Sequence, residues 1–320
     1  METRQVLLAD AFADEPLGGN PVAVVPDGEG LSGPLLRRIG GEFGAAGVVT
    51  LQDGRLSYFA GAGTDDMVAG AVAGGTALVE RGRVDPGTHT LEIAGVDTAD
   101  TGADPEGDGE GAGLTEQVIE IDADHTVRVT LSALDCGSTS ATNADLADAL
   151  GIDVAAIDDV SADLPAGRID GYGGALVAPV NFLEHLSRAD PDGEDLTALL
   201  ADAGANRLCA FTFDTLGNDT DLHARTFDPR ADGCEVPASG VAVGACGAHL
   251  AGNPVFDGER SAVRVECGRF LDRPATIGTT LADAPAVSGK ALTVLDGTLT
   301  LPSGDDATSG NVRPLCLKPR

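Results

Sequence analysis

The sequence predicts an α+β fold made of a duplicated unit, and two observations support this class. The segments MVAGAVAGGTAL (67–78) and ASGVAVGACGAHL (238–250) share one glycine register, in which Gly70 and Gly74 align with Gly240 and Gly244. Each segment lacks Pro and turn pairs, so it is expected to be helical, and strand-like runs flank it on both sides. At 320 residues the chain is long enough for two ordinary domains.

The first half reads as strands, a short helix and further strands. Two strands open the fold, joined by a turn in which Gly18 and Gly19 permit positive φ. Ser32 precedes an apolar pattern with helical spacing, and the pair Asp53-Gly54 is typical of a tight hairpin. The expected strands are 4–12, 20–26, 47–52, 55–61, 87–98 and the hairpin 117–131, the expected helices begin at 32 and 67, and 97–114 is expected to be a solvated loop.

The second half repeats this order of strands, glycine-rich helix and strands. Helices are expected over 143–152 and 195–204, strands over 173–180, 206–214 and much of 261–302, and the segment 221–237 leads into the second glycine helix. We therefore expect an N-terminal lobe over residues 1–132, to which residues 306–320 are candidates to return, and a C-terminal lobe over 133–305.

Composition narrows the range of partners and the compartment. The formal net charge is −31, and Lys290 and Lys318 are the only lysines, so a phosphate backbone or an anionic membrane is repelled. This composition favours a salt-adapted cytosol, and an acidic protein of an ordinary cytosol is the alternative. The six cysteines form no C-x-x-C pair and are expected to be buried free thiols in a reducing cytoplasm. No metal-ligand spacing and no cofactor motif is present.

The two glycine segments admit two interpretations. A helix that begins just after a glycine presents unpaired N–H groups and the positive end of its dipole, which together favour a carboxylate or phosphate. Two such helix starts facing one cleft would hold a small anion. Alternatively, small residues four apart let a helix pack closely against strands on every side, and packing alone would then explain both segments.

Three longer stretches resemble one family. ADAFADEPLGGNPVAVV, DLHARTFDPRADGCEVPASGVAVGACGAHL and GRFLDRPATIGTTL are similar to the opening, the second active-site segment and the closing G-R-P segment of PhzF-like phenazine-biosynthesis isomerases. The resemblance covers most of the chain in the right order. It implies the diaminopimelate-epimerase fold, which has two pseudo-symmetric lobes, each with a β-barrel-like sheet around a central helix, and a ligand between the lobes. It also implies a cofactor-independent homodimer.

On this resemblance the two glycine helices begin at the shared cleft. The backbone N–H groups of Gly70, Ala71, Gly240 and Val241 would then hold the carboxylate of a small metabolite. Asn20, in the motif GGNP, matches a position that faces the ligand, and its alternative role is to stabilise the turn after Gly19. Ser239 lies at the start of the second helix, where it is a ligand contact or a helix cap.

The resemblance implies that the usual proton-transfer residues of the family are replaced in this sequence. The resemblance places Ala46 or Gly47 where the family has a glutamate, and Ala71 where it has a histidine. Val236 takes the place of an aspartate and Val241 that of a serine. A methyl or isopropyl group transfers no proton, and positioned acid–base groups each contribute about 10²–10⁴-fold in rate. We therefore expect the family's chemistry to be impaired.

Other residues could substitute for the missing groups. Glu235 is the best remaining acid, although a carboxylate near the start of a helix also has a structural role there. Asp65 and Asp66 are expected to cap the first glycine helix, His223 to be structural, and Cys246 to lie in the core. Ala69 and Ser239 occupy the positions at which the epimerase branch of the fold has cysteines, so racemisation by two thiols is not expected.

Three functional hypotheses follow. The first is a PhzF-like protein that has lost its proton-transfer residues and binds a small carboxylated metabolite. The second is an active isomerase or epimerase that uses a recruited acid–base residue such as Glu235. The third is a structural or interaction protein whose acidic surface matters more than its cleft.

Overall fold

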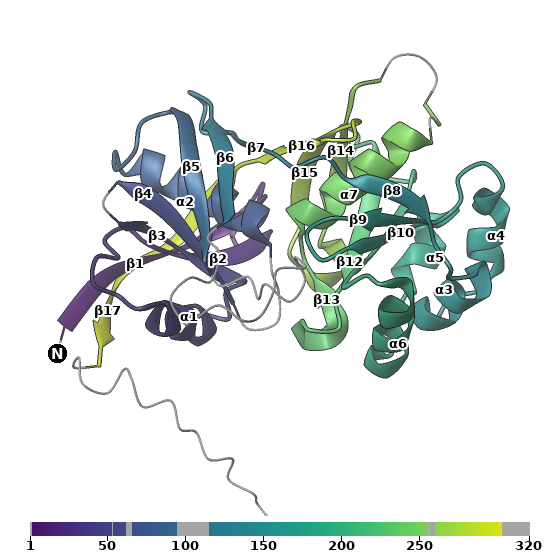
Figure 1. Cartoon of the computed structure of the whole chain (residues 1–320), viewed down its shortest axis with the longest axis horizontal. Helices are drawn as coiled ribbons and strands as arrows, with labels where there is room; N and C mark the ends of the chain where they lie inside the picture. Colours follow the sequence, from purple (N-terminus) through teal and green to yellow (C-terminus); the bar gives the residue numbers. More distant parts are fainter. Residues whose placement is uncertain are drawn as a thin grey trace, which may run out of the picture.

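Two lobes lie side by side in the structure, a computed structural model that describes residues 2–52, 54–61, 66–94, 115–253, 255–256 and 260–302 (Figure 1). Helix α2 (Met67–Glu80) lies at the centre of the first lobe and helix α7 (Gly240–Gly252) at the centre of the second. The predicted α+β class with two lobes and two central helices is confirmed. The expected loop at 97–114 and the tail at 306–320 lie outside the described residues.

The remaining helices are short and most belong to the second lobe. They are α1 (Gly33–Glu42), α3 (Asn143–Leu150), α4 (Ala155–Ser161), α5 (Leu183–Ser187) and α6 (Gly193–Ala203), with the 3-10 turns η2 (Asp232–Cys234) and η3 (Arg269–Leu271). Helix α3 begins at Thr142, whose side chain and that of Asp145 form a reciprocal capping box. Ser32 stands at the N-cap of α1 as predicted, but its side chain makes no capping hydrogen bond.

The described strands form one continuous sheet that runs through both lobes. The first lobe contains β1 (Glu2–Ala11), β2 (Asn20–Val25), β3 (Gly47–Gln52), β4 (Arg55–Ala60), β5 (Gly87–Ala94), β6 (Thr115–Ile121), β7 (Val127–Thr130) and β17 (Ala291–Leu301). The second contains β8 (Asp135–Ser138), β9 (Gly167–Asp170), β10 (Ala175–Pro179), β11 (Leu208–Thr212), β12 (Leu222–Phe227), β13 (Glu235–Val236), β14 (Ala262–Cys267) and β15 (Ala275–Thr280). Strand β16 (Ala286–Gly289) pairs with β7 on one side and β15 on the other, so it joins the lobes.

The last strand corrects the lobe boundary expected from the sequence. Residues 133–305 were assigned to the second lobe, but β17 pairs antiparallel with β1 along the whole of β1, from Glu2 opposite Leu301 to Ala11 opposite Ala291. The alternation of apolar and polar residues identifies 291–301 as a strand, but a period of two does not specify the partner strand. The chain therefore returns to the first lobe before residue 305.

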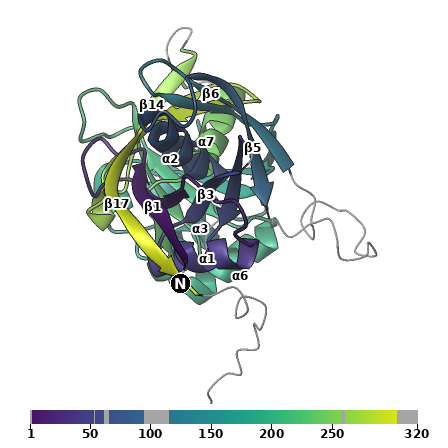
Figure 2. The same ribbon diagram turned by 90° about the vertical axis from the view of Figure 1, so that its left-hand side faces the viewer.

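Each lobe wraps its strands around one helix, and small side chains fill the space between. Residues 67–79 of α2 and 240–250 of α7 are all buried. Viewed from the first lobe, α2 lies in front of α7 within the surrounding strands (Figure 2). The buried residues are mainly Val, Leu and Ala, as the composition predicts. A separate apolar cluster packs α3, α4, α5 and α6 against the outer face of β10 and β11.

The turn between β1 and β2 shows two different reasons for its glycines. Gly19 has φ of +55°, the left-handed region that favours glycine, as predicted. Gly18 is needed for a different reason, because a Cβ atom there would lie 2.4 Å from the carbonyl oxygen of Pro274. Gly18 therefore permits a close approach of the second lobe and does not supply the predicted positive φ.

Candidate functional site between the central helices

Helix α2 begins at Asp66, which satisfies its first free N–H groups. The carboxylate Oδ1 of Asp66 accepts a hydrogen bond from the backbone N–H of Ala69 at 3.0 Å, the usual geometry of an N-cap. The backbone N–H of Gly70 donates to the carbonyl oxygen of Asp66 at 3.2 Å. The capping role predicted for Asp66 is thus confirmed, whereas Asp65 lies outside the described residues.

Helix α7 begins at Ser239, and its cap is a neutral hydroxyl. Ser239 Oγ accepts from the N–H of Ala242 at 3.2 Å, and the N–H of Val243 donates to the Ser239 carbonyl at 3.0 Å. The N–H groups of Gly240 and Val241, which come before these, belong to the first turn, where a helix has no internal acceptor. A carboxylate is favoured at such a position by the helix dipole.

The glycines at the two helix starts are also required for packing. A Cβ atom on Gly70 would lie 2.4 Å from the ring of Tyr58, and one on Gly240 would lie 2.6 Å from the side chain of Val68 in α2. The two helices therefore touch near their N-termini. The packing interpretation of the glycine segments is supported, because the small residues bring the helices together and this contact places both helix starts at the lobe boundary. Anion binding at these helix starts stays a prediction.

Asn20 connects the two lobes at the same point. Its side-chain Nδ2 donates to the carbonyl oxygen of Ala238 at 2.8 Å, and the residue is buried. Ala238 directly precedes the Ser239 cap of α7. Asn20 thus bonds across the lobe boundary, and its side chain does not serve only the turn after Gly19.

A small cavity of about 10 Å³ lies at this boundary, enough for about one water molecule. As lined by the described residues, this cavity is too small for a metabolite. Its walls come from both lobes and are mostly polar, and they are formed by Asn20, Asp66, Arg207, Thr226, Asp228, Val236 and Ser239. Asn20 and Ser239 were predicted as site residues, whereas the roles of Arg207, Thr226 and Asp228 in the wall were not.

Arg207 and Asp228 are neighbours because of the strand register. Leu208 of β11 pairs with Phe227 of β12, so the residue before β11 and the residue after β12 lie at the same end of the sheet. Both residues are buried. Arg207 Nε donates to Asn206 Oδ1 at 2.9 Å, and Asp228 accepts from the Arg230 guanidinium at 2.9 and 2.7 Å. The negative charge of Asp228 is thus already balanced by Arg230.

The positions at which the resemblance expects the family's catalytic groups carry apolar residues or glycine, which are buried except for the half-buried Ala46. Val236 lines the cavity, whereas Ala71 and Val241 are buried in the N-terminal parts of α2 and α7 and do not line it. At the fourth position, the Tyr58 hydroxyl donates to the Ala46 carbonyl at 3.4 Å, and a Cβ on Gly47 would lie 2.4 Å from the same ring. No side chain at these positions transfers a proton.

Glu235 is held by an arginine and does not line the cavity. Its two carboxylate oxygens accept from Arg225 Nε at 2.9 Å and Nη2 at 2.6 Å. The Arg225 guanidinium also lies over the rings of Phe227 and Phe270 and donates to the carbonyls of Leu186 and Ala189. Both residues of the ion pair are nearly buried, so Glu235 fixes β13 ahead of α7 and is not placed to meet a ligand.

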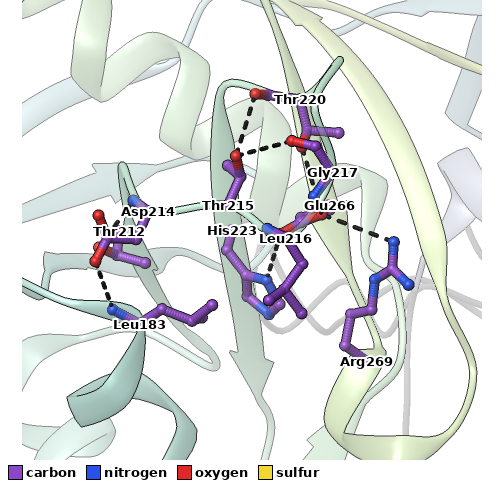
Figure 3. Close-up of polar contacts among 10 residues, drawn as sticks. All are labelled: Leu183, Thr212, Asp214, Thr215, Leu216, Gly217, Thr220, His223, Glu266 and Arg269. Carbon is purple, nitrogen blue, oxygen red and sulfur yellow. Dashed lines mark hydrogen bonds and ion pairs between the residues drawn. The ribbon is translucent and has the colours of Figure 1, made fainter.

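His223 forms a buried pair with Glu266 in the second lobe (Figure 3). Its Nδ1 lies 2.9 Å from Glu266 Oε1, and Glu266 also accepts from the backbone N–H groups of Leu216 and Gly217. Burial lowers the pKa of His223, although Glu266 opposes this. Burial alone would raise the pKa of Glu266, but its hydrogen bonds outweigh burial and the pKa is lowered. The pair fastens the loop after β11, which agrees with the structural role predicted for His223.

Three thiols of the second lobe belong to the core, as predicted for Cys246, whereas Cys136 is exposed and Cys234 is half-buried, contrary to the expectation of burial. Cys209, Cys246 and Cys267 are buried free cysteines. A hydrogen bond with Cys209, together with burial, raises the pKa of Cys246 well above its usual value, and burial does the same for Cys267. Among the described residues, no group of three or more His, Cys, Asp or Glu side chains is arranged to hold a metal ion. Within the same part of the chain, no helix is long and apolar enough to cross a membrane.

Comparison with known proteins assigns the family. Residues 9–297 match the PhzC-PhzF family, described as phenazine biosynthesis-like protein. The chain belongs to this family. A curated relative of this PhzF-like chain, "Uncharacterized isomerase YfhB" of Bacillus subtilis (strain 168), is 27% identical over 261 residues, which cover 78% of this chain and 82% of that protein.

Solved structures show the same fold. The PhzF-family phenazine biosynthesis protein of Bacillus anthracis superposes with a TM-score of 0.75 at 22% identity, covering 94% of this chain and 100% of that one. A predicted epimerase of Pseudomonas aeruginosa superposes with a TM-score of 0.68 at 20% identity, covering 93% of this chain and 100% of that one. The PhzF-like chain therefore shares its architecture with these proteins over nearly its full length.

Proposed function

We propose that this PhzF-like chain binds a small carboxylated metabolite between its lobes and lacks the family's usual proton-transfer groups. The observation that carries the proposal is the polar cavity at the starts of α2 and α7, which both lobes line while Val236 occupies the place of a family aspartate. Ala71 and Val241, at two other such places, are buried. The chain thus keeps a polar lining that suits a ligand, while the positions of the family's acid–base groups carry apolar residues.

The charges around the cavity favour an anion on the α7 side. Asp66 places its own carboxylate at the start of α2, and the N–H of Gly70 is already bonded to the Asp66 carbonyl. A ligand carboxylate is therefore expected at the N–H groups of Gly240 and Val241, near the Arg207 guanidinium and Ser239. Because Arg230 balances Asp228, that carboxylate does not repel the ligand strongly.

Binding at this cavity requires it to widen, because about 10 Å³ holds no metabolite. Titration of a panel of carboxylated metabolites, followed by calorimetry, tests the proposal in molar salt and in low salt, since the net charge is −31. Arg207→Met is expected to weaken binding about tenfold or more through loss of a charge-assisted contact. The matched control Arg264→Met removes an exposed arginine of β14 and is expected to bind normally. Equal affinities in the two variants, or no binding across the panel, contradict the proposal.

An active isomerase is the second candidate, and one observation favours it. Asp66 and Asp228 line the cavity from opposite lobes, as a proton donor and acceptor on two faces of a substrate would. Proton exchange in heavy water distinguishes the candidates: a protein that only binds incorporates no deuterium into the metabolite. Deuterium uptake that disappears in Asp66→Asn or Asp228→Asn would establish a recruited acid. Uptake that disappears only in Glu235→Gln would instead restore the role first considered for that residue.

A further inference from the structure

Arg273 joins the turn that carries Asn20 to the second lobe. It follows η3 and directly precedes Pro274 and β15. Its Nε donates to the Gly19 carbonyl at 2.8 Å, and its Nη2 donates to the Gly18 carbonyl at 2.7 Å and to Asp10 Oδ1 at 2.8 Å. One guanidinium therefore holds two successive carbonyls and one carboxylate of the first lobe.

Asp10 supplies the carboxylate that binds Arg273, and it also binds the turn itself. The residue is buried in β1, and its second oxygen accepts from the backbone N–H of Leu17 at 3.0 Å. The N–H of Gly19 donates to the Pro274 carbonyl at 3.0 Å, so the same turn is bonded to the second lobe from its other side. Residues 17–19 are thus fixed immediately before Asn20.

The other side of Arg273 lies close to the start of α7. The N–H of Arg273 donates to the Gly268 carbonyl at 3.0 Å, and Gly268 has φ of +71°. A Cβ on Gly268 would lie 2.8 Å from the carbonyl oxygen of Pro237, the residue before Ala238. Asn20 bonds to Ala238 itself. Arg273 therefore stands between the two segments that meet at the candidate site, yet it does not line the cavity.

We infer that Arg273 is a positioning residue that, with Asp10, sets Asn20 against the start of α7 and so shapes the ligand site without touching the ligand. The link to a ligand rests on the proposed function, whereas the positioning of Asn20 does not. The planar guanidinium suits this task, because one fork of donors reaches the carboxylate and both carbonyls together. A lysine ammonium presents its charge at a single point and does not reproduce this fork.

Hydrogen exchange of the Asn20 side-chain amide, followed by NMR on the full chain without ligand, tests the inference. In Arg273→Ala, Asn20 exchange is expected to accelerate about tenfold or more beyond any change at the Val243 backbone amide in α7. Arg273→Lys and Asp10→Asn are expected to give smaller accelerations in the same direction. The matched control Arg264→Ala removes an exposed arginine, paired only with Asp219 among described residues, and should leave Asn20 unchanged.

Equal acceleration at Asn20 and Val243 would show a general loss of stability and would overturn the inference, as would an unchanged Asn20 amide. If Arg273→Ala does not fold, the acceleration at Asn20 is compared with that at Val243 in Arg273→Lys and Asp10→Asn instead. The measurement needs no metabolite, so it is independent of the proposed function. If the chain binds no carboxylate but shows the Asn20 response, the proposed function is wrong and the positioning role of Arg273 still holds.

Discussion

The two central helices are built from almost the same residues but begin in different ways. Both are buried along nearly their whole length, and both place glycines where a larger side chain would collide with a neighbour. Helix α2 is capped by the carboxylate of Asp66, whereas α7 is capped by the hydroxyl of Ser239. The shared part of the pattern thus serves packing, and the part that differs gives the two helix starts different charges.

The strongest test of the shared packing role is a leucine in the middle of either helix. A Cβ on Gly74 would lie 2.5 Å from Val49, and one on Gly244 would lie 2.5 Å from Leu131. Gly74→Leu and Gly244→Leu are each expected to lower the free energy of unfolding by about 3 kcal/mol, because the added side chain overpacks a core in which both neighbours are buried. Chemical denaturation measures the change.

Gly252, the last residue of α7, is the matched control for these variants. Nothing lies within 4 Å of a Cβ placed there. Gly252→Leu is expected to be neutral or to stabilise by up to about 0.8 kcal/mol through helix propensity. A loss in one central helix but not in the other would show that the glycine register is not a shared packing device.

The next largest effect is expected from acid, which should destabilise the second lobe more than the first. The buried histidines His223 and His249 both belong to the second lobe. Burial lowers both pKa values in the folded state, so the unfolded chain takes up protons more readily as the pH falls. Their contribution to stability is complete above the unfolded value of 6.5 and is lost as the pH falls from there through the lowered folded values. Glu266 adds a further loss below its unfolded value of 4.5.

The expected loss of unfolding free energy between pH 7 and 5.5 is on the order of 1 kcal/mol. Hydrogen exchange should show the amides of α7 losing protection before those of α2. His223→Gln keeps a donor for Glu266 but does not titrate in this range, so it should flatten the pH dependence. Identical pH profiles for this variant and the natural chain would contradict the assignment.

The smallest effects are expected at the caps, where the helices differ. Ser239→Ala should lower the free energy of unfolding by about 1 kcal/mol, because the N–H of Ala242 loses its acceptor. Asp66→Asn should change it by only about 0.3 kcal/mol, because an asparagine oxygen still caps Ala69. Asp66→Asn also removes the negative charge at the start of α2. When inorganic sulfate is titrated and followed by NMR, the N–H signals of both helix starts should shift in this variant. In the natural chain, mainly the N–H signals of α7 should shift.

Local patterns predicted most of the fold. The hairpins β3–β4 and β6–β7 and both glycine helices follow from turn pairs and apolar spacing that neighbouring residues fix. The short elements were missed for a physical reason. Helix α5 has five residues, too few to establish a helical period, and all four residues of β8 are exposed, so no alternation marks it.

The site was predicted where it depends on local geometry and missed where it depends on strand pairing. The Asp66 cap follows from its place before the helix, whereas the position of Asn20 came from a resemblance. Arg207 and Asp228 lie 21 residues apart in the sequence and meet only through the β11–β12 register. The available signal was a charged residue directly at the end of each buried strand.

The pairing of β17 with β1 has a consequence for synthesis. During synthesis β1 waits for its partner until about 280 further residues, from Ala11 to Ala291, have been added, so the sheet of the first lobe is incomplete until then. The first lobe does not match a contiguous stretch of the gene, and a cut between residues 132 and 133 would leave β17 attached to the fragment that carries the second lobe.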